Sequence, residues 1–458
     1  MRAAIEHERA QLASGTCHRL LDLVPQSRLD QWMAAHVGPH RQRLFTPGVT
    51  LGLFVEQTLR ADPACQDAVA RYVSQRNAAG LSSAGLGTGA YCKARQRLPL
   101  ALIEACAAEV AVRAEDALPT DARWRGRRIW LVDGTEVSMP DTPTLQDTFP
   151  QNRSQAAGVG FPRARIVGVI SLGSGCVGHW SLGPCSGKRT GESSQLWGLL
   201  DRFAPGDIVI ADRGYGSYWL LAALQQRGVD FVIREHGARK TASSPGSRLG
   251  ANDRRLVWAR PVRPAWMDTA TYDALNDTMS VREVTDGKRR IVTSLNDPAD
   301  VSAHEIAWLY TQRWQIELDF RSIKCAMNMD VLRCKSPEMV RKEIAATLLA
   351  YNLIRATMGE AAGAKRVVLR QLSFAAARRA AAQYQDTARH AGCNRICSQA
   401  RTQMLQHIAY WRIPERPGRI EPRAIKRRPK PRDLLTEPRR HARARIAKQN
   451  AALRESMA

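Results

Sequence analysis

The 458-residue sequence predicts an α/β protein in which helical regions flank a sheet-forming part. Apolar residues recur at helical spacing through residues 1–118, and from about residue 127 short β-branched runs alternate with helical segments. Such alternation is typical of a sheet covered by helices on both faces. The last region is helical in pattern and then strongly basic. We expect three domains, over residues 1–120, 121–360 and 361–458.

The N-terminal region predicts a helical domain with a basic edge. Residues 51–59 and 100–112 have helical periodicity, and a glycine-rich loop over residues 80–89 precedes the short basic helix AYCKARQRLP. This helix carries Lys93, Arg95 and Arg97, which are candidate contacts to DNA phosphates. An ordinary solvated helix face is the alternative.

The sheet-forming region contains several short apolar runs bounded by Gly, Pro and Asp. The strands are expected at residues 128–132, 166–172, 177–182, 207–211, 231–234 and 290–295. Residues 235–289 are rich in Gly, Ser, Arg and Pro with short strand-like pieces, and they predict an insertion before the last of these strands. A long helix is expected from about residue 302 to 325, and another over 337–355.

The net charge favours a polyanionic partner. The chain has 68 Lys+Arg against 43 Asp+Glu, a formal net charge of +25, and such a surplus attracts nucleic acid. A tail over residues 411–448, including Lys426, Arg427 and Arg428, has the composition of a phosphate-binding segment, with a solvated tail as the alternative.

The composition also excludes a membrane or secretory role. Mean hydropathy is −0.34, and no apolar run approaches the length of a membrane span. Charged residues occupy the N-terminus where a signal peptide needs an apolar run, and the ten cysteines are scattered. We therefore expect a cytoplasmic protein with reduced thiols.

Two aspartates follow apolar strands. Asp133 stands in WLVDGTEVSMPDTP before an apparent turn glycine, and Asp212 stands in DIVIADRGYGS. Carboxylates at the carboxyl ends of strands emerge at the sheet edge, where active sites of α/β folds are built. The alternative for each is a residue that starts a turn or caps the next helix.

A third acidic residue lies in the long helix. Tyr310, Arg313, Glu317 and Lys324 stand at positions 0, +3, +7 and +14, which fall within about 60° of one another over about 21 Å. Such a stripe suits a metal-bridged phosphodiester, with Glu317 binding a cation and the other groups binding phosphate oxygens. The opposite face, including Trp308, is expected to face the core. An ordinary solvated face with an Arg313–Glu317 pair is the alternative.

These motifs together resemble the transposases of the insertion sequence IS4 type. Tyr310-x2-Arg313-x3-Glu317-x6-Lys324 has the spacing of the family's Y-R-E-K signature, and DGT at 133–135 and DRGY at 212–215 resemble its two aspartate motifs. PDTP at 140–143, AYCKARQRLP and RPGRIEPRAIKRRPKP are also similar. The resemblance covers roughly residues 80–440.

The resemblance implies a DDE transposase with an RNase H-like core and a mostly β insertion over residues 235–295. Asp133, Asp212 and Glu317 would be catalytic and bind two Mg²⁺ ions, for which Mn²⁺ can substitute. The partners implied are double-stranded DNA, both transposon ends and target, and a second copy of the chain on that DNA. The location implied is the bacterial cytoplasm, associated with the nucleoid.

The family also passes through a DNA hairpin, for which relatives stack a tryptophan on a flipped base. At the start of RIVTSL, where relatives have that tryptophan, this chain has Arg289 and Arg290. Trp258 and Trp266 are the nearest tryptophans, and the sequence does not decide between them.

Two other patterns in the sequence suggest different sites, a nucleotide-binding loop and a zinc site. GPCSGKRT at 183–190 resembles a P-loop but is one residue short between its glycines and has Arg189 where Ser or Thr is needed. A zinc set of His390, Cys393, Cys397 and His407 lacks a paired CxxC. Two functional alternatives stay open: a non-catalytic DNA-binding inhibitor of transposition, and a DDE-type nuclease without strand transfer.

Overall fold

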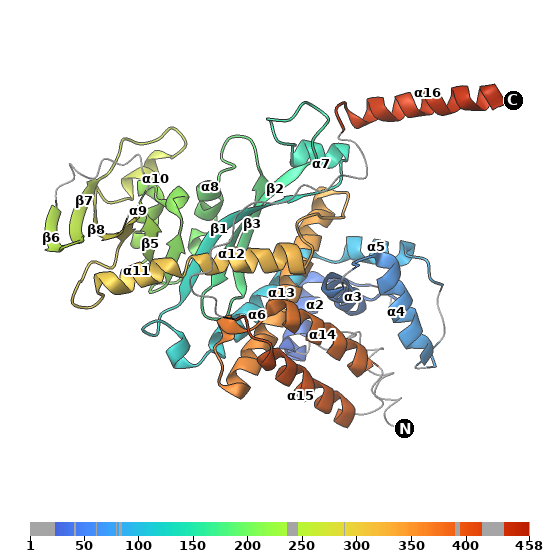
Figure 1. Cartoon of the computed structure of the whole chain (residues 1–458), viewed down its shortest axis with the longest axis horizontal. Coiled ribbons are helices and arrows are strands. Elements are labelled where there is room, and N and C mark those ends of the chain that lie inside the picture. Colours follow the sequence, from blue (N-terminus) through green and yellow to red (C-terminus); the bar gives the residue numbers. More distant parts are fainter. Residues whose placement is uncertain are drawn as a thin grey trace.

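The computed structural model describes most of the chain as a mixed α/β molecule (Figure 1). The described residues are 23–40, 43–60, 62–78, 80–81, 85–235, 246–287, 289–389, 394–414 and 435–457. Lys426, Arg427 and Arg428 of the predicted tail, and His390 and Cys393 of the zinc alternative, lie outside them.

A single mixed sheet of nine strands runs through the middle of the described part, in the order β3-β2-β1-β4-β5-β9-β8-β7-β6. The strands are β1 (Ile129–Ser138), β2 (Arg163–Ser171), β3 (Val177–Pro184), β4 (Ile208–Ala211), β5 (Asp230–Arg234), β6 (Gly246–Gly250), β7 (Asp253–Ala259), β8 (Thr278–Asp286) and β9 (Arg289–Thr293). All six strand segments expected from the apolar runs are present, so the α/β prediction is confirmed.

The first five strands have the topology expected of an RNase H-like core. β1, β2 and β3 pair antiparallel, whereas β4 and β5 continue the sheet parallel to β1. The predicted insertion is also β-rich. Its strands β6, β7 and β8 join the same sheet through β9, which pairs antiparallel with β5.

Helices cover both faces of the sheet because side chains of β1 alternate between two cores. Leu131 belongs to a cluster with α6 (Leu100–Asp116), α12 (Trp314–Arg321) and α13 (Pro337–Lys365). Trp130 and Val132 belong to a second cluster with α8 (Glu192–Trp197) and α9 (Tyr218–Gln226). The short helices α7 (Pro143–Thr148) and α10 (Thr269–Asp273) lie in loops between strands.

The N-terminal region is helical, as predicted. Its other helices are α2 (Gln26–His36), α3 (Pro47–Leu59), α4 (Cys65–Ala78) and α5 (Gly89–Arg97). The Thr46 side chain caps α3, and Pro47 occupies its first turn. Both α3 and α6 contact α13, whose 29 residues run past the expected boundary at residue 360. One hydrophobic cluster therefore joins this region to the sheet.

The expected long helix is present as consecutive segments. α11 (Ala303–Thr311) begins at a capping box between Ser302 and Glu305. A tight turn at Gln312 and Arg313 separates it from α12, which continues as a π-helical turn over Ser322–Ala326. Figure 1 shows α11 and α12 end to end across the sheet.

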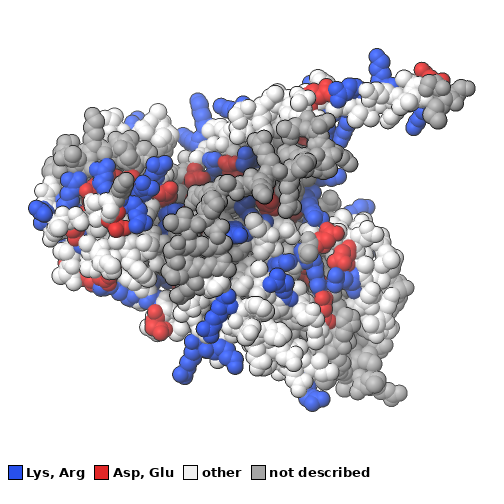
Figure 2. All heavy atoms as spheres, in the orientation of Figure 1, with Lys and Arg blue, Asp and Glu red and all other residues white. Residues whose placement is uncertain are grey.

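The C-terminal region is also helical, as predicted. α14 (Phe374–Arg389) and α15 (Asn394–Tyr410) pack together, and α13 contacts both. α16 (Arg439–Met457) extends away from the body in Figure 1, and Figure 2 shows Lys and Arg side chains along it. Within the described residues, no helix is long and apolar enough to span a membrane.

A buried carboxylate holds α12 to the rest of the protein. Asp319 is fully buried and accepts hydrogen bonds from Tyr351 Oη at 3.0 Å, from Arg355, and from Arg370 Nη1 at 2.9 and 2.8 Å. Arg370 also donates to the backbone carbonyls of Ser171 and Leu172 at the end of β2. Removal of the Asp319 charge would leave both guanidinium groups without their shared counter-charge.

We expect Asp319→Asn to lower the free energy of unfolding by about 3–5 kcal/mol, because the buried Arg355 and the partly buried Arg370 lose their shared counter-charge. Urea denaturation of the full chain measures this loss. The control is Asp201→Asn, since Asp201 is 89% exposed in its pair with Arg227 and such a pair contributes at most about 1 kcal/mol. Equal losses in the two variants would contradict the prediction.

Candidate active site

The parallel pairing of β1 and β4 brings two of the predicted carboxylates together. Val132 lies opposite Ala211 in the ladder, so the next residues, Asp133 and Asp212, emerge side by side where β4 ends. Asp212 follows its strand as expected. Asp133 does not end its strand, because β1 continues through Gly134, which pairs with Val167 rather than forming a turn.

Glu317 and Arg313 face Asp133 from the helical segment. Arg313 Nη2 donates to Glu317 Oε1 at 2.8 Å, and Arg313 Nη1 lies 3.7 Å from Asp133 Oδ2. The guanidinium therefore bridges two carboxylates that come from a strand and a helix. The Arg313–Glu317 pair that sequence offered as the ordinary alternative is present, but it lies at the sheet edge rather than on an isolated solvated face.

Tyr310 completes the contact between the helical segment and the strand ends. Its side chain is only 6% exposed, and its hydroxyl donates to Asp212 Oδ1 at 3.3 Å. Burial raises the pKa of Tyr310, and the charge of Asp212 adds to this shift. The hydroxyl therefore stays protonated and able to donate a hydrogen bond to an anion.

Lys324 of the predicted stripe and Trp308 of the opposite face take no part in the contacts described above. Lys324 is half-exposed in the π-helical turn, where no ion pair involves it within the described part of the chain. Trp308 was expected in the core and is 47% exposed, so that prediction is wrong. The turn at Gln312 and Arg313 interrupts the ideal helical wheel on which the prediction depended.

The electrostatics of the site act most strongly on Asp133. Burial raises the pKa of its carboxyl to about 6, against the hydrogen bond from the Gly134 N–H and the charge of Arg313. The negative charges of Glu192 and Glu317 add to the rise. Asp133 is thus a carboxylate whose ionised form lacks sufficient positive charge nearby.

The donor set fits a divalent cation in chemical type. Asp133, Asp212 and Glu317 supply the oxygen ligands that Mg²⁺ prefers, and Asp133 and Glu317 already converge on one cationic group, the guanidinium of Arg313. Among the described residues, no three acidic, His or Cys side chains form a closed metal cluster.

The basic helix α5 divides into exposed and buried cations. Lys93 and Arg97 are exposed, as a contact to DNA requires. Arg95 is only 6% exposed, so the structure does not support the expectation that it contacts phosphate. Its guanidinium stacks over the Phe54 ring at 4.0 Å, and it donates to Cys65 Sγ at 3.0 Å.

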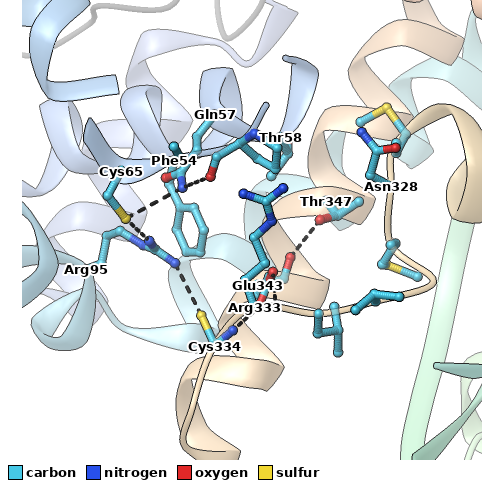
Figure 3. Close-up of a pocket in the computed structure, with 16 residues that line it drawn as sticks. Phe54, Gln57, Thr58, Cys65, Arg95, Asn328, Arg333, Cys334, Glu343 and Thr347 are labelled. Atoms are coloured by element: carbon cyan, nitrogen blue, oxygen red, sulfur yellow. Dashed lines mark hydrogen bonds between the residues drawn. The ribbon is translucent and has the colours of Figure 1, made fainter. Parts of the chain in front are cut away.

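Figure 3 shows the cavity beside Arg95, between α3 and the chain that follows the π-helical turn. Arg95 also approaches Cys334 Sγ at 3.4 Å, and Glu343 accepts from the backbone N–H of Cys334. None of the three candidate carboxylates lines this cavity. Its polar groups serve the packing of the N-terminal helices on the sheet-forming region.

The two tryptophans considered for base stacking differ in exposure. Trp258 is 4% exposed within the second core cluster, so no base can stack on it without unfolding β7. Trp266 is 45% exposed and packs edge-on against Trp197 of α8 at 5.6 Å. Arg189, from the P-loop-like segment, donates to the Trp266 carbonyl at 3.2 Å. Of the two, Trp266 is the tryptophan that a ligand can reach.

Sequence reasoning missed one acidic residue near the site. Glu192, the first residue of α8, lies against the backbone of Gly134, where a Cβ would stand 2.3 Å from Glu192 Oε1. The glycine that was interpreted as a turn residue instead leaves room for this close approach. The glycine directly after Asp133 was the feature of the sequence that could have indicated a side chain packed closely against the backbone there.

Comparison with known proteins finds a matching family model and several similar proteins. The family model described as the transposase DDE domain matches residues 124–353. The transposase of insertion sequence element IS4 from Escherichia coli strain K12 is 28% identical over 359 residues, which cover 74% of this chain and 76% of that protein. A putative transposase of element IS186A from the same strain is 44% identical over 195 residues, 34% of this chain and 52% of that protein.

A solved structure of a piggyBac transposase synaptic complex with hairpin DNA also matches. The identity is 10%, the TM-score is 0.40, and the match covers 86% of this chain and 84% of the other. The fold assignment depends on the strand order of this chain itself rather than on that likeness.

We expect the free energy of unfolding of Asp133→Asn to rise relative to that of the unsubstituted chain as pH increases from about 4 to about 6, measured without divalent metal. The folded state keeps the Asp133 proton to a pKa of about 6, whereas the unfolded chain releases it near 3.8. Stability attached to this carboxyl is therefore present at low pH and lost as pH rises through this window. The difference should reach about 1–3 kcal/mol in urea titrations in EDTA.

Glu305→Gln is the matched control with the opposite sign. Hydrogen bonds from Arg125 and then from Ser302 lower the pKa of Glu305 to about 2. The stability that this carboxylate contributes is present above about pH 4.5 and is lost as pH falls towards 2. If the difference in unfolding free energy between Asp133→Asn and the unsubstituted chain does not change with pH, burial does not destabilise the ionised Asp133 carboxylate, and the prediction is wrong.

Proposed function

Because the chain belongs to the DDE transposases of the IS4 type, we propose that it binds the terminal inverted repeats of an insertion sequence and catalyses Mg²⁺-dependent strand cleavage and transfer. The observation that carries this proposal is the convergence of Asp133, Asp212 and Glu317 from two strands and a helix. The family match and the relatives named as transposases support it.

The chemistry proposed needs no side-chain nucleophile. Two Mg²⁺ ions, held by Asp133, Asp212 and Glu317 and replaceable by Mn²⁺, would activate water or a DNA 3′-hydroxyl and stabilise the leaving oxygen. The protein's part is to orient the phosphodiester. Tyr310 supplies a protonated hydroxyl beside Asp212, and Arg313 supplies a fork of donors suited to phosphate oxygens.

We assign binding of the DNA backbone to exposed Lys and Arg side chains that lie away from the three carboxylates. Lys93 and Arg97 on α5 are exposed, and Lys324 follows Glu317 without a counter-charge among the described residues. The basic tail with Lys426, Arg427 and Arg428 extends this proposal beyond the described residues. The proposal also includes two copies of the chain that together hold the two ends of the insertion sequence. It places this complex in the bacterial cytoplasm, associated with the nucleoid.

We expect Asp133→Asn, Asp212→Asn and Glu317→Gln each to lower Mg²⁺-dependent cleavage of terminal-repeat DNA by at least about 100-fold, because each removes a carboxylate charge from the site. The substrate is the inverted repeat found in the DNA flanking the gene. End binding, measured by gel shift in Ca²⁺, should stay within a few-fold. Asp201→Asn is the control for cleavage.

The outcomes separate the functional alternatives. Cleavage that survives any one of the three substitutions would overturn the assignment of the carboxylates. End binding without cleavage by the unsubstituted chain would favour the DNA-binding inhibitor. Cleavage without joining of the ends to target DNA would favour the nuclease.

We expect Lys324→Ala to weaken end binding and to lower the slope of log affinity against log salt by about one, because one phosphate contact is lost. Fluorescence anisotropy at several salt concentrations measures both quantities. Lys365→Ala removes an exposed lysine at the far end of α13 and is the control. Equal slopes for both variants and the unsubstituted chain would leave Lys324 without a phosphate contact.

A further inference from the structure

α16 is attached to the rest of the protein through its first turn. The chain just before it packs on the loop between β1 and β2, where a Cβ at Gly158 would lie 3.2 Å from Pro438 Cβ. The Arg439 guanidinium lies over the Phe161 ring of the same loop, 5.6 Å from the ring centroid. Residues 443–455 are exposed, and the helix extends away from the body of the protein (Figure 1). Most of the surface of α16 is therefore open to a partner.

The attachment lies beyond the carboxyl end of the strand that carries Asp133. β1 continues after Asp133 to Ser138, which is about 17 Å of extended chain, and the loop that holds α16 follows directly. α16 has 19 residues and therefore a length of about 28 Å. One turn of B-DNA is about 34–36 Å long. A duplex of a few turns that reaches the strand ends is thus long enough to reach α16 as well.

One face of α16 consists of arginines and alanines. At about 100° per residue, six exposed residues fall in a sector about 100° wide. They are Arg440, Arg443, Ala444, Ala447, Ala451 and Arg454. The three arginines lie within about 60° of one another along about 21 Å of the helix, and we call them the arginine face of α16. Because alanine side chains are short, the guanidinium groups are the outermost part of this sector, and a long anion can approach it closely.

The arginine face carries positive charge that the fold does not use. Arg445, which lies outside this face, pairs with Glu437 at 2.8 Å. By contrast, no ion pair joins Arg440, Arg443 or Arg454 to a carboxylate in the part of the chain that the structure describes. A duplex backbone carries one negative charge per about 1.7 Å of its length, so it offers phosphates along the whole of this face.

The charge of α16 favours DNA over a second copy of the chain as the partner of this face. The helix contains six Lys and Arg residues and one acidic residue, Glu455, which lies outside the arginine sector. Two copies that met through this face would bring like charges together, which opposes association. A polyanion meets the same face with complementary charge along its length.

We propose that the arginine face of α16 binds the phosphate backbone of duplex DNA that extends from the candidate active site. The inference rests on the proposed function, since that function brings a duplex to the strand ends. The composition of the basic tail predicted phosphate binding without a surface, whereas α16 assigns it to one helix face and three side chains. Contacts to phosphates position a duplex and do not read its sequence, so this face binds DNA of any sequence.

Binding of the full chain to a duplex of unrelated sequence and about 40 base pairs, or four turns, tests the proposal. Fluorescence anisotropy at several salt concentrations gives the slope of log affinity against log salt. We expect the double variant Arg443→Gln, Arg454→Gln to bind more weakly and to have a slope smaller by about two, because two phosphate contacts are lost. The matched control is Arg445→Gln, Lys448→Gln, which removes two charges of the same helix from outside the arginine face. Its slope should stay close to that of the unsubstituted chain.

The outcomes distinguish this inference from the proposed function. An unchanged slope in Arg443→Gln, Arg454→Gln, with cleavage of the ends by the unsubstituted chain, would overturn the role of α16 and leave the proposed function intact. A changed sedimentation coefficient of this variant without DNA, at unchanged DNA affinity, would assign the face to a second copy and overturn the inference. Absence of duplex binding by the unsubstituted chain would overturn both.

A pair of charge insertions gives a second test. Ala447→Glu places a carboxylate within the arginine face, and Ala452→Glu places the same charge about 140° away around the helix. Both alanines are exposed, and Glu and Gln are good helix formers, so α16 is kept in every variant, which circular dichroism verifies. We expect Ala447→Glu to weaken duplex binding several-fold more than Ala452→Glu. Equal weakening in the two variants would assign the effect to the net charge of the chain and overturn the inference.

Discussion

The position of α12, the helix that carries Glu317, depends on the buried charge of Asp319. This carboxylate lies two residues after Glu317, on the side of α12 that faces away from solvent, and two arginines and a tyrosine surround it. Arg355 belongs to α13, and Arg370 also binds the carbonyls at the end of β2. One ionised group thus fixes the helix that carries Glu317 against both a central helix and the sheet that carries Asp133.

Other arginines also stabilise the fold through contacts inside the protein. Arg282 is fully buried, pairs with Asp253 and donates to the Val301 carbonyl just before α11. Arg95 is also buried, between aromatic rings and thiols. Some of the 68 Lys and Arg side chains are therefore not available to DNA, because they serve contacts inside the fold.

The sequence predicted the parts of the structure that depend on local pattern. Apolar runs of β-branched residues located the strands, and two runs that end in Asp placed Asp133 and Asp212 at neighbouring positions. The burial of Arg95 and the exposure of Trp308 were not predictable, since each depends on which distant element packs there. Glu192 belongs to no spaced motif, and its approach to Gly134 depends on how α8 crosses β1.

The site places charges where the folded protein alone does not stabilise them. Burial raises the pKa of Asp133 to about 6, against the hydrogen bond from the Gly134 N–H and the charge of Arg313. Burial of this charge costs folding free energy, and the contacts of Asp319 hold α12, which carries Glu317, in place near it. Of the three carboxylates that the proposed function assigns to Mg²⁺, Asp133 is thus the one whose ionised form is destabilised by burial in the folded protein.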